Sequence, residues 1–192
     1  MKLAIVDLGY GNIGSIALAF ERLGVSASLT ADPAALAGAD RVVLPGVGGA
    51  GHAMARIESL GLADVLRGLT QPALGICLGM QLLFDRSAED GVDCLGLIPG
   101  EVRALDPAPG RPVPHMGWSR VEAVGEATGL ASGDYVYFAH SYACADGPAT
   151  IARADYGVAI PAAVRHGNWT GAQFHPERSA AAGARFLQAF LA

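Results

Sequence analysis

Pro72-Ala-Leu-Gly-Ile-Cys77-Leu-Gly-Met-Gln81 is the stretch that decides the fold. Its apolar residues before Cys77 predict a buried strand, and the residues after it predict a helix that runs on to Phe84. Gly75 and Gly79 stand two residues before and two residues after the cysteine. Small residues there let a strand and a helix pass closely at a sharp turn. The pattern is that of a nucleophile elbow, with cysteine in place of serine.

The position of Cys77 suits a reactive thiol. At a helix N-terminus, free N–H groups and the positive end of the helix dipole favour the thiolate. The N–H of Leu78, the next residue, is placed to donate to a developing oxyanion. The alternative is a buried cysteine in a core strand, which is a common place for free cysteine. A core strand would not need glycine on both sides, so we predict that Cys77 is a nucleophile.

A general base is supplied late in the chain by Gln173-Phe174-His175-Pro176-Glu177. Pro176 favours an extended conformation at His175, which places the histidine at a strand end. The two-residue spacing can bring Glu177 to the far imidazole nitrogen, where a third group fixes the tautomer. An isolated His-Pro-Glu would more simply be a strand-end histidine and a solvated glutamate. Together with the elbow, it predicts a Cys–His–Glu triad.

The first part of the chain alternates between apolar runs and segments of helical spacing, which predicts a doubly wound, mostly parallel central sheet with helices on both faces. The catalytic residues should then lie at the C-terminal ends of the strands. The predicted strands here are Lys2–Asp7, Ala27–Thr30, Arg41–Leu44 and Ala73–Ile76, and the predicted helices are Asn12–Leu23, Pro33–Leu36, Ala53–Ser59 and Leu62–Leu69.

After Phe84 the pattern changes to strands separated by Gly, Pro and Asp turns, which predicts an added antiparallel portion. These strands are Glu101–Leu105, Trp118–Val124, Asp134–Tyr142, Thr150–Tyr156 and Ala162–Arg165. Trp169–Phe174 should return to the core sheet, and Ala180–Leu191 should form a final amphipathic helix. No repeat or linker interrupts the chain, so we expect one α/β domain over residues 1–192.

Composition excludes several classes of function. The net charge is −5 and no Lys/Arg cluster occurs, which argues against a nucleic-acid partner. No apolar run approaches the roughly 18 residues of a membrane span, and the first residues lack the features of a signal peptide. The three cysteines, Cys77, Cys94 and Cys144, are odd in number and lack metal-type spacing. Reduced thiols in a cytoplasmic protein are the expected state.

The remaining histidines carry weaker signals. His52 and His166 are expected to be exposed. His115 and His140 lie beside apolar and aromatic residues, and we expect core histidines with one satisfied nitrogen each. No pair has a metal-ligand spacing, so no metal site is predicted.

Two glycine-rich turns remain. Pro45-Gly46-Val47-Gly48-Gly49 follows a predicted strand and could supply a second oxyanion donor, although in isolation a simple glycine-rich turn would be the favoured interpretation. Gly9-Tyr-Gly11-Asn-Ile-Gly14 matches a dinucleotide-binding pattern, with Asp32 near the place of a ribose-binding acid. A non-enzymatic nucleotide-binding module is therefore a rival hypothesis, but it leaves Cys77 and His175 unexplained.

The elbow Gly75-x-Cys77-x-Gly79-x-Gln81 together with Phe174-His175-Pro176-Glu177 resembles the class I glutamine amidotransferases. More specific stretches resemble one branch of that family, the glutaminase subunits of imidazole glycerol phosphate synthases in histidine biosynthesis. The resemblance covers essentially the whole chain. The stretches of this branch are Asp7–Asn12, Leu44–Gly48, Pro114–Trp118 and Tyr137–Tyr142.

The resemblance implies glutamine hydrolysis without a cofactor. Cys77 would be the nucleophile, His175 the general acid–base and Glu177 its orienting partner, and a glutamyl thioester would release ammonia and then glutamate. The implied oxyanion donors are the N–H of Leu78 and an amide of the Val47-Gly48 turn. The positions that would hold substrate glutamine are Gly46, Gly48, Gln81, Ser141 and Tyr142.

The resemblance also implies a heterodimer with a cyclase subunit of (β/α)8 barrel fold, to which ammonia is passed. The cyclase would make imidazole glycerol phosphate and aminoimidazole-carboxamide ribotide. The implied interface positions are Asn12, Trp118, Tyr137 and Arg178. Arg178 stands where the family usually has lysine, and Gly49-Ala50-Gly51 lacks the usual phenylalanine. The glutaminase of another class I amidotransferase, such as that of pyridoxal phosphate synthase, is the alternative enzyme.

Overall fold

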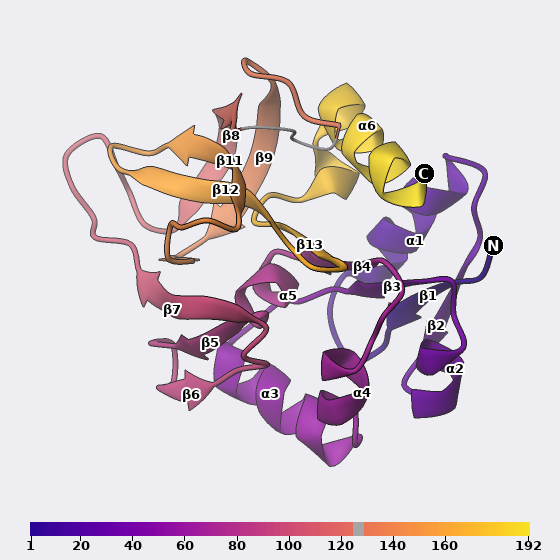
Figure 1. The fold of residues 1–192 in the computed structure, drawn as a ribbon. Helices are drawn as coiled ribbons and strands as arrows, with labels where there is room; N and C mark the ends of the chain where they lie inside the picture. Colours follow the sequence, from indigo (N-terminus) through magenta and orange to yellow (C-terminus); the bar gives the residue numbers. More distant parts are fainter. Residues whose placement is uncertain (125–128) are drawn as a thin grey trace.

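The computed structural model describes residues 1–124 and 129–192 (Figure 1). Within these ranges the larger sheet combines five parallel strands with four antiparallel ones. The parallel strands are β1 (Leu3–Val6), β2 (Ala27–Thr30), β3 (Arg41–Leu44), β4 (Ala73–Ile76) and β13 (Trp169–Ala172). The antiparallel strands are β8 (His115–Ala123), β9 (Tyr135–His140), β11 (Thr150–Asp155) and β12 (Ala159–His166).

The strand order is β2-β1-β3-β4-β13-β12-β11-β8-β9. The pairs from β2 to β13 are parallel, and those from β13 to β9 are antiparallel. Strands β1 and β4 are buried at every position, which explains why their sequences are continuous apolar runs without polar alternation. The predicted parallel core and antiparallel addition are confirmed.

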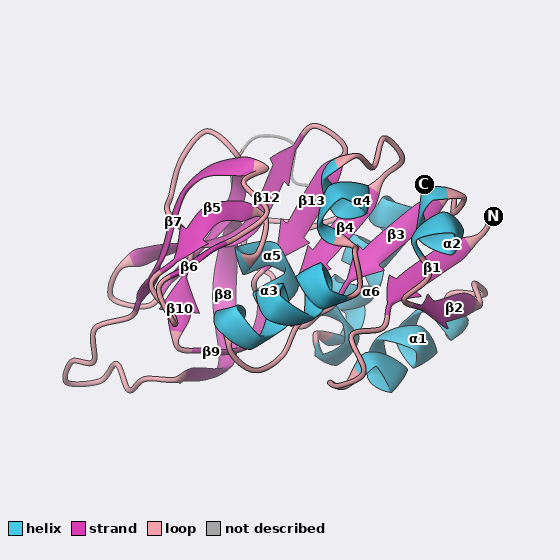
Figure 2. Ribbon diagram, turned by 90° about the horizontal axis from the view of Figure 1, so that it is seen from below, coloured by secondary structure: helices cyan, strands magenta, loops and turns pink. Residues whose placement is uncertain are grey.

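Helices cover both faces of the parallel strands, as predicted. Ala4 and Val6 of β1 pack on the side of α2 (Pro33–Ala37), α3 (Ala50–Ser59) and α4 (Ala63–Arg67). Leu3 and Ile5 point to the other side, toward α1 (Ile13–Glu21) and α6 (Ala180–Leu191). In Figure 1, α1 and α6 lie above the sheet, and α2, α3 and α4 lie below it. Figure 2 looks from the side of α2, α3 and α4.

A smaller sheet follows the elbow, and here the sequence prediction was wrong. The helix after Cys77, α5, spans only Leu78–Gln81 and does not reach Phe84. Phe84 instead opens β5 (Phe84–Ser87) and pairs with Ile98 of β7. Its ring is 1% exposed, so strand pairing and burial outweigh the local helical pattern.

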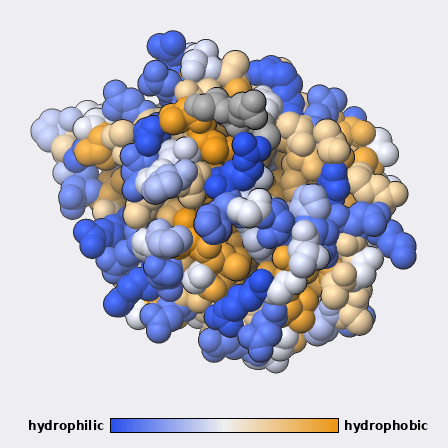
Figure 3. Space-filling model, in the orientation of Figure 1, coloured by the Kyte–Doolittle hydropathy of each residue, from blue (hydrophilic) through white to orange (hydrophobic). Residues whose placement is uncertain are grey.

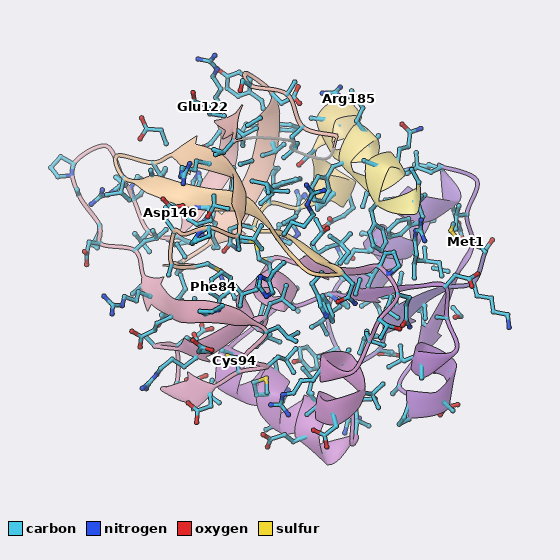
Figure 4. The ribbon with its side chains drawn as sticks, in the orientation of Figure 1. Met1, Phe84, Cys94, Glu122, Asp146 and Arg185 are labelled. Atoms are coloured by element: carbon cyan, nitrogen blue, oxygen red, sulfur yellow. The ribbon has the colours of Figure 1, made fainter. Side chains whose placement is uncertain are left out.

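The order of the smaller sheet is β10-β7-β5-β6. Its other strands are β6 (Val92–Asp93), β7 (Ile98–Ala104) and β10 (Tyr142–Ala143). Phe84 and Cys94 belong to the same apolar cluster as α3 and α4, and Figure 4 labels Cys94 beside α3. The smaller sheet therefore extends the lower layer of the molecule.

Polar and charged side chains are spread over the face seen in Figure 3, with apolar side chains showing between them. In the described part of the chain, no helix is long and apolar enough to cross a membrane.

Replacing Gly75 by alanine should destabilise the fold. An alanine Cβ there would lie 2.5 Å from the carbonyl oxygen of Gly79 and 2.8 Å from the nitrogen of Met80, which are backbone atoms that cannot turn aside. We expect the free energy of unfolding to fall by about 1–3 kcal/mol in Gly75→Ala, measured by urea denaturation and circular dichroism.

Gly14→Ala is the matched control, because a Cβ at Gly14 meets nothing within 4 Å and the residue lies inside α1. That variant should gain up to about 1 kcal/mol. Equal stability of the Gly75→Ala variant and the wild type would show that the crossing of β4 and α5 is not tight.

Candidate active site

Cys77 stands at a sharp turn between β4 and α5. Its backbone has φ 55° and ψ −113°, a left-handed φ that a residue with a side chain rarely adopts. A Cβ at Gly46 would lie 2.5 Å from the nitrogen of Gly79, and a Cβ at Gly79 would collide with the carbonyl oxygen of Leu44. The end of β3 therefore packs directly against the start of α5, and the glycines on both sides make the elbow possible.

A cavity of about 460 Å³ opens beside Cys77. It lies at the C-terminal ends of the parallel strands, because the segments after β1, β3, β4 and β13 all contribute to its wall, as predicted for this sheet type. Residues from the end of β9 and the segment after it close the opposite side. The cavity brings together the predicted residues Gly46, Val47, Gly48, Cys77, Leu78, Gln81, Ser141, Tyr142, His175, Glu177, Arg178 and Asn12.

His175 and Glu177 form a buried pair on the cavity wall. His175 has the extended backbone predicted before Pro176, with φ −97° and ψ 98°. Its Nδ1 lies 2.8 Å from Oε1 of Glu177, and the side chains are 15% and 4% exposed. The backbone N–H of His175 donates to the carbonyl of Tyr137 at 2.9 Å, which ties the histidine to β9.

The side chains of Cys77 and His175 both line the cavity, and their interaction affects the pKa of the histidine. Burial lowers the pKa of His175, but hydrogen bonds and negative charge from Cys77 and Glu177 raise it, and the net result is a pKa of about 10. The imidazole is therefore protonated at neutral pH. The Cys77 sulfur also lies 4.0 Å from Nε2 of Gln173 and 3.9 Å from the carbonyl oxygen of Ala139. This geometry provides a sulfur nucleophile beside a proton donor.

The glycine-rich loop after β3 is held from two sides. A Cβ at Gly11, which has φ +101°, would lie 3.0 Å from Cγ2 of Val47, so the loop after β1 packs closely against it. On the other side, the N–H of Ala50 donates to Glu89 at 2.9 Å and the N–H of Gly51 donates to Asp90 at 3.1 Å. These carboxylates satisfy donors at the start of α3 that have no partner inside the helix.

Glu89, which also lines the cavity, and Asp90 were missed by sequence reasoning. They follow β5, a strand that the sequence pattern did not predict, and their carboxylates act on a helix almost forty residues away in sequence. An acidic pair just before Gly91 was the only signal, and it resembles an ordinary polar turn.

Gln81 is 4% exposed and therefore is not a helix-surface side chain. Its Nε2 donates to the carbonyl of Tyr142 at 2.9 Å and to Oε1 of Gln173 at 3.0 Å. Its side-chain oxygen is thus the atom left to face a ligand. Ser141 and Tyr142 are half-buried on the cavity wall.

The predictions for the other histidines are confirmed in part. His52 and His166 are exposed, as expected. His115 and His140 are buried, but the expectation of one satisfied nitrogen in each was wrong, because both ring nitrogens of both residues have partners. The two rings bond to each other, which the sequence did not indicate because they lie on different strands.

The four proposed interface residues lie around the cavity mouth and on the adjoining face of the β8–β9 pair. Trp118 and Tyr137 are cross-strand neighbours with ring centroids 6.1 Å apart, and the Arg178 guanidinium carbon lies 4.6 Å from the Tyr137 ring centroid. Trp118 is 52% exposed. Asn12 is exposed, and its Oδ1 accepts from the hydroxyl of Ser15.

Two residues of the proposed nucleotide-binding pattern, Gly11 and Asp32, have structural roles in this fold. Gly11 permits the contact with Val47 described above, and Asp32 accepts from the N–H of Ala34 and caps α2. The carboxylate of Asp32 is thus used within its own helix.

Known proteins resemble this chain over nearly its whole length. The sequence profile of the family described as "Glutamine amidotransferase class-I" matches residues 4–192. The "Imidazole glycerol phosphate synthase subunit HisH" of Xanthomonas euvesicatoria pv. vesicatoria (strain 85-10) is 50% identical over 192 residues, covering 98% of this chain and 96% of the relative. The protein of the same name from Xylella fastidiosa (strain Temecula1) is 50% identical over 193 residues, covering 99% and 96%.

Solved structures show the same fold at lower identity. A crystal structure of a glutamine amidotransferase has a TM-score of 0.78 at 20% identity and covers 100% of this chain and 97% of that chain. The glutaminase domain of Trypanosoma brucei CTPS with bound acivicin has a TM-score of 0.64 at 19% identity, covering 100% and 94%.

The raised pKa of His175 depends on Cys77 and can be tested directly. In Cys77→Ala, the interactions with the sulfur that raise the pKa of His175 are lost while burial remains, so this pKa should fall below its value of about 10. A histidine-selective NMR titration measures this pKa. Cys144→Ala, which removes another buried cysteine, should leave it unchanged.

The sign for stability follows from the same shift. Because the folded pKa lies above the ordinary value of 6.5, the contribution of His175 to the free energy of unfolding is complete below that value and is lost as the pH rises through about 10. The stability advantage of the wild type over Cys77→Ala should shrink over that range. An unchanged His175 pKa in Cys77→Ala would contradict the coupling.

Proposed function

The chain belongs to the class I glutamine amidotransferase family, and we propose that it hydrolyses glutamine as the glutaminase subunit of an imidazole glycerol phosphate synthase in histidine biosynthesis. The observation that carries the proposal is the meeting of Cys77 with the hydrogen-bonded pair of His175 and Glu177 at one cavity. The whole of residues 1–192 is assigned to this one glutamine amidotransferase domain. The two relatives at 50% identity favour this subunit over the glutaminase of pyridoxal phosphate synthase.

In the proposed mechanism, the sulfur of Cys77 attacks the side-chain amide carbon of glutamine and forms a tetrahedral oxyanion. His175, already protonated, gives its proton to the amide nitrogen, the C–N bond breaks, and ammonia leaves a glutamyl thioester. Water then attacks the thioester, His175 takes its proton, and the C–S bond breaks to release glutamate. Glu177 holds Nδ1 of the imidazole and stabilises its positive charge throughout.

The oxyanion would accept hydrogen bonds from the N–H of Leu78 and from an amide of the Val47–Gly48 turn. The close contact of Gly46 with the Leu78–Gly79 backbone supports this pairing, because it brings the turn beside the start of α5. Such prepositioned donors stabilise charge that develops only in the transition state. Substrate glutamine would be held by Gly46, Gly48, the side-chain oxygen of Gln81, Ser141 and Tyr142.

The partner of this subunit would be a cyclase of (β/α)8 barrel fold, which receives the ammonia in a cytoplasmic heterodimer. An exposed aromatic group at the cavity mouth supports docking there, since aromatic and Arg side chains are enriched at protein interfaces. Trp118 and Tyr137 supply the rings and Arg178 the charge, with Asn12 on the neighbouring loop. Ammonia would then leave the cavity directly into the partner.

Glutamate release from glutamine, with and without a cognate cyclase subunit and its nucleotide ligand, tests the activity. Wild type should be active in the complex, and Cys77→Ala should lose activity by about 10⁴-fold or more. Glu177→Gln, which keeps the volume and removes the charge, should lose about 10²- to 10⁴-fold in kcat. Cys144→Ala is the matched control and should retain activity. Equal glutamate release by wild type and Cys77→Ala would refute the proposed glutaminase activity.

Trp118→Ala should weaken association with the cyclase. Truncation of a half-exposed aromatic anchor commonly costs about 2 kcal/mol at an interface, so Kd measured by titration calorimetry should rise about 30-fold. Leu29→Ala removes another exposed apolar side chain, on β2 at the opposite edge of the larger sheet from β9, and should leave Kd unchanged. An unaltered Kd for Trp118→Ala would place the partner elsewhere.

A further inference from the structure

The buried pair His115 and His140 has no part in the chemistry above. The two side chains are 2% and 5% exposed. Nδ1 of His115 lies 3.0 Å from Nε2 of His140, and Nε2 of His115 lies 2.8 Å from the hydroxyl of Ser119. Nδ1 of His140 lies 2.8 Å from the carbonyl oxygen of Tyr142. Four groups on β8, β9 and β10 thus form one row.

The hydrogen-bond direction along this row follows from its last member. The carbonyl oxygen of Tyr142 can only accept, so His140 must carry its proton on Nδ1 and present a bare Nε2. His115 must then donate from Nδ1, and its own bare Nε2 accepts from the Ser119 hydroxyl. Burial lowers the pKa of His115 to about 4 and likewise that of His140, which keeps both rings neutral at pH 7. Every donor therefore points from β8 toward the cavity.

Aromatic packing holds the row rigid. The ring of His115 is stacked between Phe138, at 4.6 Å and 19°, and Tyr156, at 3.8 Å and 24°. A ring packed on both faces has little freedom to rotate. The positions of its two nitrogens are therefore set by packing as well as by hydrogen bonding.

The two ends of the row lie in different parts of the fold. Ser119 directly follows Trp118 on β8, but its side chain points to the opposite, inner face of the strand together with His115. At the other end, the carbonyl of Tyr142 also accepts from Gln81, whose amide continues to Gln173 and so to the sulfur of Cys77. A nearly unbroken polar path joins the inner face of β8 to the nucleophile.

We propose that His115 and His140 are positioning residues that hold the Ser141–Tyr142 wall and the Gln81 amide in place for glutamine. The inference rests on the proposed function, since glutamine is the ligand to be positioned. The row supplies geometry and no proton transfer, because its last acceptor is a backbone carbonyl that cannot pass a proton on. Loss of a link should weaken glutamine binding while leaving the triad intact.

The direction of the row is tested by NMR of the imidazole nitrogens in the wild-type chain. We expect both His115 and His140 in the Nδ1–H tautomer with unprotonated Nε2, without titration between pH 6 and 8. An Nε2–H tautomer at either residue would contradict the hydrogen-bond direction derived for this row. This measurement does not depend on catalytic activity.

Positioning is tested by steady-state kinetics of the complex with the cyclase subunit. His115→Phe keeps the stacking and removes both hydrogen bonds, and it should raise KM for glutamine about tenfold with kcat within about twofold. Ser119→Ala should raise KM about threefold, and Ser119→Thr, which retains the hydroxyl, should restore it. The exposed His166→Gln is the control and should match wild type.

The outcomes separate the two proposals. If wild type hydrolyses glutamine but KM is unchanged in His115→Phe, the positioning role is wrong and the glutaminase stands. If His115→Phe does not fold, the Ser119→Ala and Ser119→Thr pair decides, and equal KM values in the two overturn the inference. Inactive wild type in the complex would refute the proposed function itself, while the tautomer measurement would still decide the row.

Discussion

The left-handed backbone of Cys77, with φ 55°, is the constraint on which the rest of the site depends. A residue with a side chain adopts this conformation at a cost of roughly 1–3 kcal/mol, and only surrounding structure can hold it there. Here β4 arrives from the centre of the sheet and α5 leaves at once, with the backbone of β3 pressed against the crossing. Gly46, Gly75 and Gly79 permit that contact because any Cβ would meet backbone atoms. The same crossing that forces the turn projects the sulfur into the cavity.

Strand β9 connects the two halves of the molecule at this point. The carbonyl of Tyr137 accepts from the backbone of His175, and the carbonyl of Ala139 faces the sulfur of Cys77. His140, at the end of the strand, bonds to the segment that closes the cavity. The proposed triad residues thus follow the parallel strands, while antiparallel strands supply contacts that hold them. Because β9 pairs with β8, the exposed Trp118 stands on the neighbour of the strand that contacts both Cys77 and His175.

The difference between local sequence patterns and pairing of distant segments explains which features of the structure could be predicted. Arg41–Leu44 and Ala73–Ile76 begin and end as strands where predicted, because strands buried within the sheet have continuous apolar sequences bounded by turn residues. Ala27–Thr30 also has the predicted bounds, although this edge strand is largely exposed. The helix predicted to Phe84 failed because the residue's partner in β7 lies beyond an intervening turn and hairpin. Glu89 and Asp90 were missed for a similar reason, since their role depends on the distant start of α3. Local patterns record local conformation, and they carry no information about which distant segment will pair.

The sequence by itself determined the elbow around Cys77, the extended His-Pro-Glu segment with Glu177 two residues from His175, and the alternation of strands and helices. Each of these follows from steric or hydrogen-bonding rules that act within a few residues. Only the tertiary structure decided that the segments after β4 and β13 meet at one cavity, that both nitrogens of His115 and His140 are used, and that Gln81 is buried. These depend on sheet order and strand register, which are set by the packing of the whole core. Short-range sterics place a side chain on its own segment, whereas long-range pairing decides what that side chain meets.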